Sequence, residues 1–151
     1  MEIIANKMPA ISLGLPVYNG ESYLAQAIEA VQQQTNGHFE LIITDNASTD
    51  GTEAICRVYE RRDRRIRYYR NESNLGAAGN FNCDFALAGG PFFKWVAYDD
   101  LMASAFLERC VDVLHRDPSV VLCYPRASII DENGEFLENY DFKLNTEFSQ
   151  P

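Results

Sequence analysis

The chain has 151 residues, of which 46% are hydrophobic and 12% aromatic, and its formal net charge at pH 7 is −9. This composition excludes a disordered chain and suits one domain with a sizeable core, while the negative charge disfavours a nucleic-acid partner. No segment approaches the roughly 18 apolar residues of a membrane-spanning helix, and the first nine residues contain no signal-peptide core. We therefore expect a cytoplasmic protein, either free or peripheral to a membrane. The four cysteines are widely spaced and the two histidines isolated, which does not indicate a zinc or redox site.

Apolar segments of strand length alternate with segments of helical periodicity along the chain. In chain order the pattern predicts strand 11–15, helix 21–34, strand 39–44, helix 52–61, strand 66–69, helix 77–88, strand 92–97, helix 103–115 and strand 120–124. The sequence Asp131-Glu132-Asn133-Gly134 predicts a hairpin turn between 127–130 and 135–137. Strands separated by helices indicate an α/β fold, a Rossmann-like, mostly parallel sheet with helices on both faces. We expect one domain over residues 1–137 and a polar, irregular tail over residues 138–151.

Polar or glycine-containing loops follow each of the first four predicted strands. The loops are Pro16–Gly20, Asp45–Gly51, Asn74–Asn80 and Asp99–Asp100. Each loop alone is also explained by turn formation or helix capping, but ligands enter an open α/β sheet at the carboxyl ends of its strands. The paired carboxylates offer hard oxygen ligands to Mg²⁺ or Mn²⁺, which keep coordination positions free for substrate phosphates. The sequence therefore suggests a metal–diphosphate site, although it contains neither a glycine-lysine phosphate loop nor a dinucleotide fingerprint.

Taken together, these loops resemble the N-terminal part of a family 2 glycosyltransferase with the GT-A fold. The resemblance rests on the order and spacing of the motifs across Ala10–Leu101, about two-thirds of the chain. It implies a nucleotide-diphosphate sugar donor, with UDP as the expected nucleotide, and Mn²⁺ or Mg²⁺ as the cofactor. It also implies hexosyl transfer with inversion to an acceptor saccharide or lipid-linked saccharide, as in the synthesis of cell-envelope polysaccharide.

The resemblance also assigns roles to single residues. Pro16 and Tyr18 would line the nucleotide, and Asp45 would accept a hydrogen bond from the base. Asp99 would contact the ribose or sugar, and Asp100 would ligate the metal. The remaining residues that the matching motifs place in the nucleotide-sugar site are Asn19, Gly76 and Asn80.

Two departures from the family pattern limit what the resemblance implies. The chain has Gly79 where the family often has an arginine, so a basic group that would face the donor is absent. A complete family domain is also longer, roughly 200–250 residues. Its general base lies beyond the matched stretch, and the carboxylates of Asp131, Glu132 and Glu135 suit the hairpin turn better than that role. We therefore assign no catalytic residue.

Three interpretations remain open from the sequence. The first is the donor-binding part of a glycosyltransferase, and the second is a nucleotide-binding or assembly module that lacks transfer activity. The third is a sugar nucleotidyltransferase, which would need a glycine-rich loop with a basic residue after the first strand, and Pro16–Gly20 contains no basic residue. An incomplete sheet edge near the C-terminus leaves homo-oligomer formation open.

Overall fold

The main sheet has four parallel strands. The computed structural model describes residues 9–140. The strands are β1 (Ile11–Val17), β2 (Phe39–Asp45), β3 (Ile66–Arg70) and β4 (Phe93–Trp95), in the spatial order β3-β2-β1-β4. β1 is central, pairs with both β2 and β4, and is buried along its whole length, as expected for a parallel strand covered on both faces. The predicted α/β class and its parallel sheet are confirmed.

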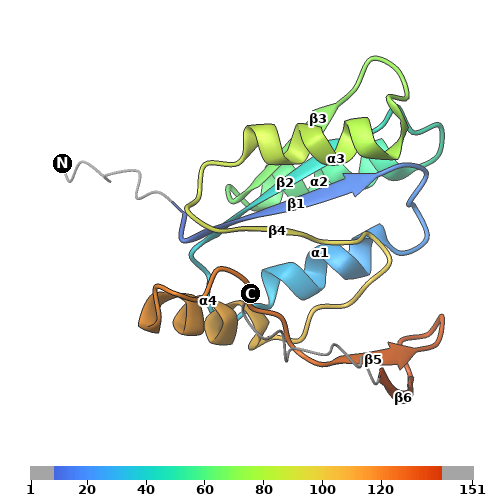
Figure 1. Ribbon diagram of the computed structural model, residues 1–151. Coiled ribbons are helices and arrows are strands. Elements are labelled where there is room, and N and C mark those ends of the chain that lie inside the picture. The colour runs from blue at the N-terminus through green and yellow to red at the C-terminus, as the bar shows by residue number, and fades with distance from the viewer. Residues whose placement is uncertain (1–8, 141–151) are drawn as a thin grey trace, which may run out of the picture.

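Helices cover both faces of this sheet. They are α1 (Leu24–Gln32), α2 (Thr52–Arg62), α3 (Gly76–Leu87) and α4 (Phe106–Arg116). Side chains of α1, α2 and α4 share one hydrophobic core with alternate residues of β1 and β2. α3 lies on the opposite face, against β1 and β2 (Figure 1). This arrangement is the predicted α/β/α sandwich.

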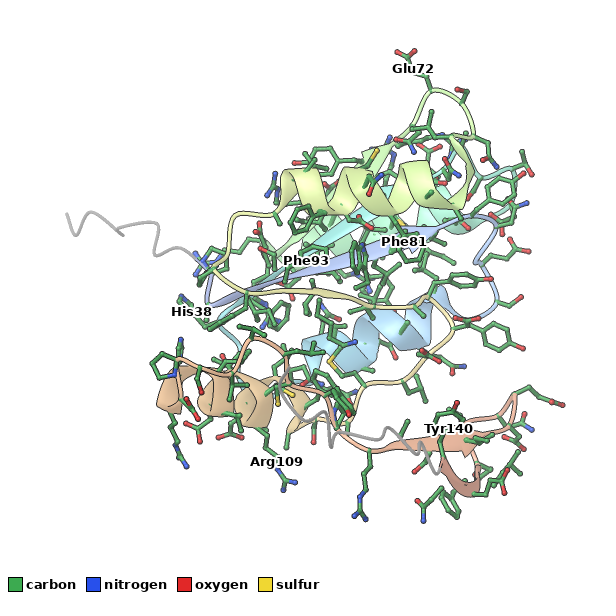
Figure 2. The ribbon with its side chains drawn as sticks, viewed as in Figure 1. His38, Glu72, Phe81, Phe93, Arg109 and Tyr140 are labelled. Atoms are coloured by element: carbon green, nitrogen blue, oxygen red, sulfur yellow. The ribbon has the colours of Figure 1, made fainter. Side chains whose placement is uncertain are left out.

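The close approach of α3 to β1 depends on a glycine. Leu13 and Leu15 point into the core shared with α1, so Gly14 between them faces α3. A Cβ atom at Gly14 would lie 2.6 Å from Cβ of Asp84 and 2.8 Å from Cζ of Phe93. Phe93 of β4 lies between that strand and α3 (Figure 2) and meets Phe85 of α3 edge to face, with the ring centroids 5.1 Å apart. The absence of a side chain at position 14 therefore allows α3 to pack closely against β1.

The predicted strand over residues 120–124 is wrong. These residues follow α4 as irregular chain, and the side chains of Val121 and Leu122 are 94% and 72% exposed. A strand is stabilised by its neighbours more than by its own composition, and within residues 9–140 no strand pairs with this segment. Its apolar residues therefore gave a misleading signal.

The predicted hairpin is present. β5 (Ala127–Ile130) pairs with β6 (Phe136–Tyr140) in a separate antiparallel sheet. In the turn between them, Oδ1 of Asp131 accepts the backbone N–H groups of Asn133 and Glu135, both at 2.9 Å. β6 runs to Tyr140, so regular structure continues three residues beyond the predicted boundary at Leu137. The remainder of the expected tail, residues 141–151, lies outside the described residues.

Element ends differ from the predicted ones by a few residues elsewhere. β1 continues through Pro16 to Val17, β4 is limited to Phe93–Trp95, and α4 begins at Phe106 rather than at residue 103. In the described part of the chain, every helix is too short or too polar to cross a bilayer.

Candidate functional site

The loop after β2 is organised by the buried carboxylate of Asp45, the last residue of that strand. Its Oδ1 accepts the amide of Ser48 at 2.8 Å, and its Oδ2 accepts the hydroxyl of Tyr68 at 2.7 Å and Nη1 of Arg70 at 2.6 Å. Burial and the hydrogen bond to Asp45 raise the pKa of Tyr68 well above its usual value. Asp45 is fully buried and already accepts these three hydrogen bonds, so a base that donates to this carboxylate has to share it with Arg70 and Tyr68 or displace one of them.

Asn19 joins the loop after β1 to the loop after β2. Its backbone N–H donates to Oγ of Ser48 at 2.8 Å, and its side-chain Oδ1 accepts the backbone N–H of Thr49 at 2.8 Å. Asn19 has a positive φ of 53°, a conformation that asparagine tolerates better than most residues. Its side-chain oxygen is thus engaged in bracing two loops, and Asn19 lines neither of the two pockets described below. Its predicted contact with the ligand remains a prediction.

Four asparagines form a continuous amide network across the ends of β1, β2 and β3 and the start of α3. Asn46 donates to Oδ1 of Asn74 at 2.8 Å, and Asn71 donates to Oδ1 of Asn46 at 3.2 Å and to Oδ1 of Asn80 at 2.9 Å. Asn80 in turn donates to the carbonyl of Thr44 at 2.8 Å. Asn46 and Asn80 are both buried. These four residues, the amide network below, fix the loops after β2 and β3 relative to the sheet.

A pocket of about 380 Å³ lies over this network, and no charged residue lines it. It brings together four of the residues predicted for the nucleotide-sugar site: Pro16, Tyr18, Gly76 and Asn80. Aromatic side chains of Tyr18, Phe81 and Tyr98 contribute to its wall, and Asn46 and Asn74 contribute amides. This cavity, the neutral pocket, suits an uncharged, planar group better than a phosphate.

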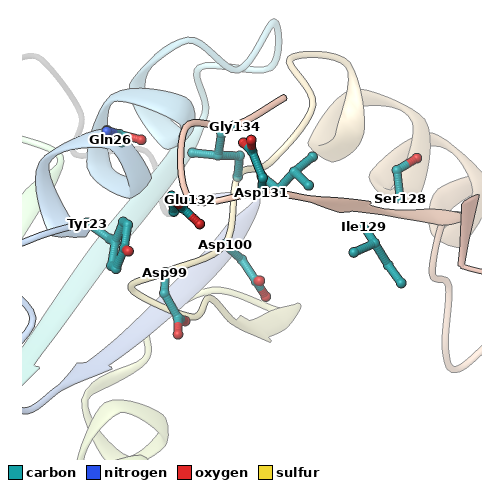
Figure 3. A pocket seen from close by; sticks show the side chains of 11 residues that line it. Tyr23, Gln26, Asp99, Asp100, Ser128, Ile129, Asp131, Glu132 and Gly134 are labelled. Carbon is teal, nitrogen blue, oxygen red and sulfur yellow. The ribbon is translucent and has the colours of Figure 1, made fainter. Parts of the chain in front are cut away.

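A second pocket, of about 430 Å³, is lined by acidic side chains (Figure 3). Asp99 and Asp100 reach it from the loop after β4, and Asp131 and Glu132 reach it from the hairpin turn. Tyr23 adds a hydroxyl from the segment before α1, and no basic residue lines the cavity. Tyr98 lines the neutral pocket and Asp99 this acidic pocket, so two consecutive residues line different cavities.

The residues of the acidic pocket suit a divalent cation that is bound by only a few protein ligands. Asp99 and Asp100 are exposed, and neither has a hydrogen bond or ion pair with another described residue. Within residues 9–140 no three His, Cys, Asp or Glu side chains are grouped to hold an ion. Mg²⁺ often binds through one or two carboxylates and completes its shell with substrate phosphates and water. The donor set therefore suits an ion that arrives with a diphosphate and not an all-protein cage.

Sequence reasoning missed several residues that shape these cavities. Tyr68 and Arg70 bind Asp45, and Asn71 joins the amide network. Arg70 ends β3 and Asn71 follows it, so the rule that parallel strands end at one sheet edge points to both, whereas Tyr68 lies in the middle of the strand. Asp131 and Glu132 were assigned to the hairpin turn alone, and their approach to Asp99 depends on tertiary folding with no local signal.

The sequence profile of glycosyl transferase family 2 matches residues 12–150, almost the whole chain. The chain belongs to glycosyltransferase family 2. A glycosyltransferase of Rickettsia bellii is 32% identical over 132 residues, which are 85% of this chain and 19% of that protein. TuaG of Bacillus subtilis, named as a putative teichuronic acid biosynthesis glycosyltransferase, is 30% identical over 91% of this chain and 54% of its own length. The chain thus spans between about a fifth and about half of the length of these curated relatives.

Two solved structures share the fold. S. aureus TarS 1–349 in complex with UDP-GlcNAc superposes with a TM-score of 0.65 and 25% identity, over 70% of this chain and 31% of TarS 1–349. The mannosyltransferase PcManGT from Pyrobaculum calidifontis, in complex with GDP-Man and Mn²⁺, has a TM-score of 0.67 at 23% identity, over 76% of this chain and 34% of PcManGT. The second likeness shows the GT-A fold alone.

Proposed function

We propose that this chain is the donor-binding part of a family 2 glycosyltransferase and holds a UDP-sugar across the two pockets. One observation carries the proposal: Pro16 and Tyr18 from one sequence motif and Gly76 and Asn80 from another line one uncharged cavity at the carboxyl end of the sheet. The UDP and UDP-GlcNAc complexes of TarS support UDP as the nucleotide.

The neutral pocket receives the nucleoside and the acidic pocket the diphosphate side of the donor. Tyr18, Phe81 and Tyr98 offer ring surface to a base or ribose without placing a charge beside it. Asp99 binds a sugar or ribose hydroxyl, and Asp100 holds Mn²⁺ or Mg²⁺. When bound, the ion offsets the negative charge of the diphosphate leaving group. Without it, four carboxylates would repel the donor.

The reaction is transfer of the sugar to an acceptor hydroxyl with inversion. An attacking hydroxyl needs a general base, and none of residues 9–140 is assigned that role here. Asp131 is committed to the hairpin turn through two amides, which lower the pKa of its carboxyl. The name of TuaG supports an acceptor in envelope polysaccharide synthesis. Because the carboxylate of Asp131 is already engaged in the turn, it is a poor candidate for the general base. This favours a second candidate function, a donor-binding module without transfer activity.

A thermal-shift panel of UDP, GDP, CDP and dTDP, each with and without Mn²⁺, tests donor binding. A ligand that binds only the folded state at about 100 times its dissociation constant adds roughly 2.7 kcal/mol to stability. We expect UDP with Mn²⁺ to give the largest shift. If none of the four nucleotides shifts the transition with or without Mn²⁺, the proposal is wrong. Release of UDP from a UDP-sugar separates the transferase from the binding module.

A further inference from the structure

Asn46 has no hydrogen-bonding capacity left for a ligand. Its Oδ1 accepts the amide of Leu75 at 2.8 Å and Nδ2 of Asn71 at 3.2 Å. Its Nδ2 donates to Oδ1 of Asn74 at 2.8 Å and to the carbonyl of Gly76 at 3.3 Å. A carboxamide offers two acceptor and two donor positions, so all four are filled. The backbone amide of Leu75 and carbonyl of Gly76 also fix which end of the group is oxygen.

Asn74, in contrast, is engaged on one side only. Its Oδ1 accepts Nδ2 of Asn46 and the amide of Gly76, both at 2.8 Å. Asn74 is exposed at the edge of the neutral pocket that it lines, and its own Nδ2 has no hydrogen-bond partner within residues 9–140. Because its oxygen is bound twice, the amide plane is held and the two N–H groups are directed away from Asn46.

We propose that Asn74 is a specificity-determining residue of the neutral pocket and that Asn46 is its positioning residue. The N–H groups of Asn74 donate to a carbonyl oxygen of the bound nucleoside, as a pyrimidine base offers. The pocket has no charged lining residue to compete for that oxygen. This inference rests on the proposed function, because it names the side chain that contacts the nucleotide of the bound UDP-sugar.

Isosteric substitutions separate the two roles. Asn74→Asp replaces the donor by an acceptor, so UDP binding should weaken at least tenfold. Asn46→Asp replaces the Nδ2 that donates to Oδ1 of Asn74 by an oxygen. A carboxylate oxygen at position 46 then faces Oδ1 of Asn74 and repels it. Asn74 then turns away, or flips and presents its oxygen to the ligand. Either way we expect a similar loss. Asn82→Asp makes the same change at an exposed position of α3 outside the pocket and should bind UDP as the unmutated chain does.

A double-mutant cycle and an amide-exchange measurement complete the test. Since Asn46 acts through Asn74, the double variant should bind UDP within about twofold of Asn74→Asp alone. Hydrogen exchange at the Gly76 amide reports on Oδ1 of Asn74 without any ligand. It should accelerate in Asn46→Asp and stay unchanged in Asn82→Asp. Asn74→Ala leaves Asn46 intact and tests the donor even if Asn46→Asp does not fold.

The outcomes are distinguishable. Unchanged UDP binding by Asn74→Asp and Asn74→Ala, an unchanged Gly76 amide in Asn46→Asp, or additive losses in the double variant would each overturn the inference. If the unmutated chain binds no UDP while the Gly76 amide loses protection in Asn46→Asp, the proposed function fails and the positioning of Asn74 by Asn46 stands.

Discussion

The guanidinium of Arg70 lies 2.6 Å from the carboxylate of Asp45, and only the arginine side of this ion pair reaches solvent. Nη2 of Arg70 also donates to the carbonyl of Ser48 at 2.7 Å. The pair therefore closes the end of β2 and fastens the following loop. A base that binds Asp45 has to share this carboxylate with Arg70 or displace it.

Replacing Asp45 should affect stability and nucleotide binding together. Asp45→Asn keeps the shape but removes the charge that Arg70 and Tyr68 face, which costs about 1.5–3 kcal/mol for hydrogen bonds to a charged group. We also expect UDP affinity to fall by one to two orders of magnitude. Urea unfolding and calorimetric titration measure the two effects. Asp112→Asn breaks an exposed pair with Arg116 and should cost less than about 0.5 kcal/mol. Unchanged UDP affinity in a folded Asp45→Asn variant would remove Asp45 from the site.

Asp84 should make stability depend on pH. Its carboxyl is fully buried on α3, and burial raises its pKa to about 7, although the nearby hydroxyl of Thr44 offsets part of the rise. The folded state then binds more protons than the unfolded state between pH 4 and 7. The contribution of Asp84 to stability is therefore present at low pH and is lost as the pH rises through about 7.

Asp84→Asn tests this dependence because the amide cannot ionise. About two of the roughly three units of pKa difference fall between pH 5 and pH 8, so over this range the stability of the variant relative to the unmutated chain should rise by on the order of 3 kcal/mol. Urea unfolding at both pH values measures the difference. A constant difference between the two proteins from pH 5 to 8 would show that Asp84 does not titrate in this range.

The spacing between α3 and β1 should not tolerate a methyl group at position 14. Gly14→Ala places a carbon within 3 Å of Asp84 and Phe93, and overpacking of this kind costs about 1–3 kcal/mol. Gly37→Ala is the matched control, since its added carbon would meet only the flexible end of Arg65 at 3.4 Å. Equal thermal stability of the two variants would mean that α3 adjusts without cost.

Much of the fold followed from the sequence because it is encoded locally. Alternating strands and helices predicted the parallel sheet, and the glycine and asparagine of the hairpin turn predicted β5 and β6. The strand predicted at 120–124 failed because pairing depends on a partner that composition does not reveal. In the site, the resemblance of the loops taken together predicted Pro16, Tyr18 and Gly76 as ligand contacts, and all three line the neutral pocket.

The hydrogen bonds of the site were beyond local reasoning. The sequence predicts that Asp45 accepts a hydrogen bond from a base, but Tyr68 and Arg70 from the next strand both donate to its Oδ2. The amide network likewise joins residues that are up to 34 positions apart, from Asn46 to Asn80. Such contacts depend on which strand ends meet, and this becomes definite only once the strand order is known.

Asp100 should couple metal and nucleotide binding. If it holds the ion, Mn²⁺ strengthens UDP binding and UDP strengthens Mn²⁺ binding by the same factor. Asp100→Asn keeps the shape and should abolish this coupling, whereas Asp99→Asn should reduce affinity for the nucleotide-sugar more than for the metal. Titrations of UDP at several Mn²⁺ concentrations measure the coupling in all three proteins. Equal UDP affinity with and without Mn²⁺ in the unmutated chain would rule out the metal assignment.

Ala47 should be replaceable by glycine with a gain in stability. It has a positive φ of 61°, which costs an L-residue roughly 1–2 kcal/mol. Glycine avoids this cost but loses about 0.5–1 kcal/mol of chain entropy, so Ala47→Gly should stabilise by about 0.5–1 kcal/mol. Ala78→Gly, in α3, should destabilise by a similar amount. A lower melting temperature for Ala47→Gly would show that the loop does not store this strain.

β4 has β1 as its only partner among the described strands. Its last residue, Trp95, has an exposed ring, and the centroid of the exposed ring of Phe85 lies 6.4 Å from that of Trp95. The outer side of β4 therefore offers unmatched backbone groups next to aromatic surface, which favours edge-to-edge association. Solution behaviour should consequently depend on protein concentration. Titrations made in dilute samples will report on the single molecule, whereas crowded samples will mix ligand binding with self-association and could hide a weak nucleotide affinity.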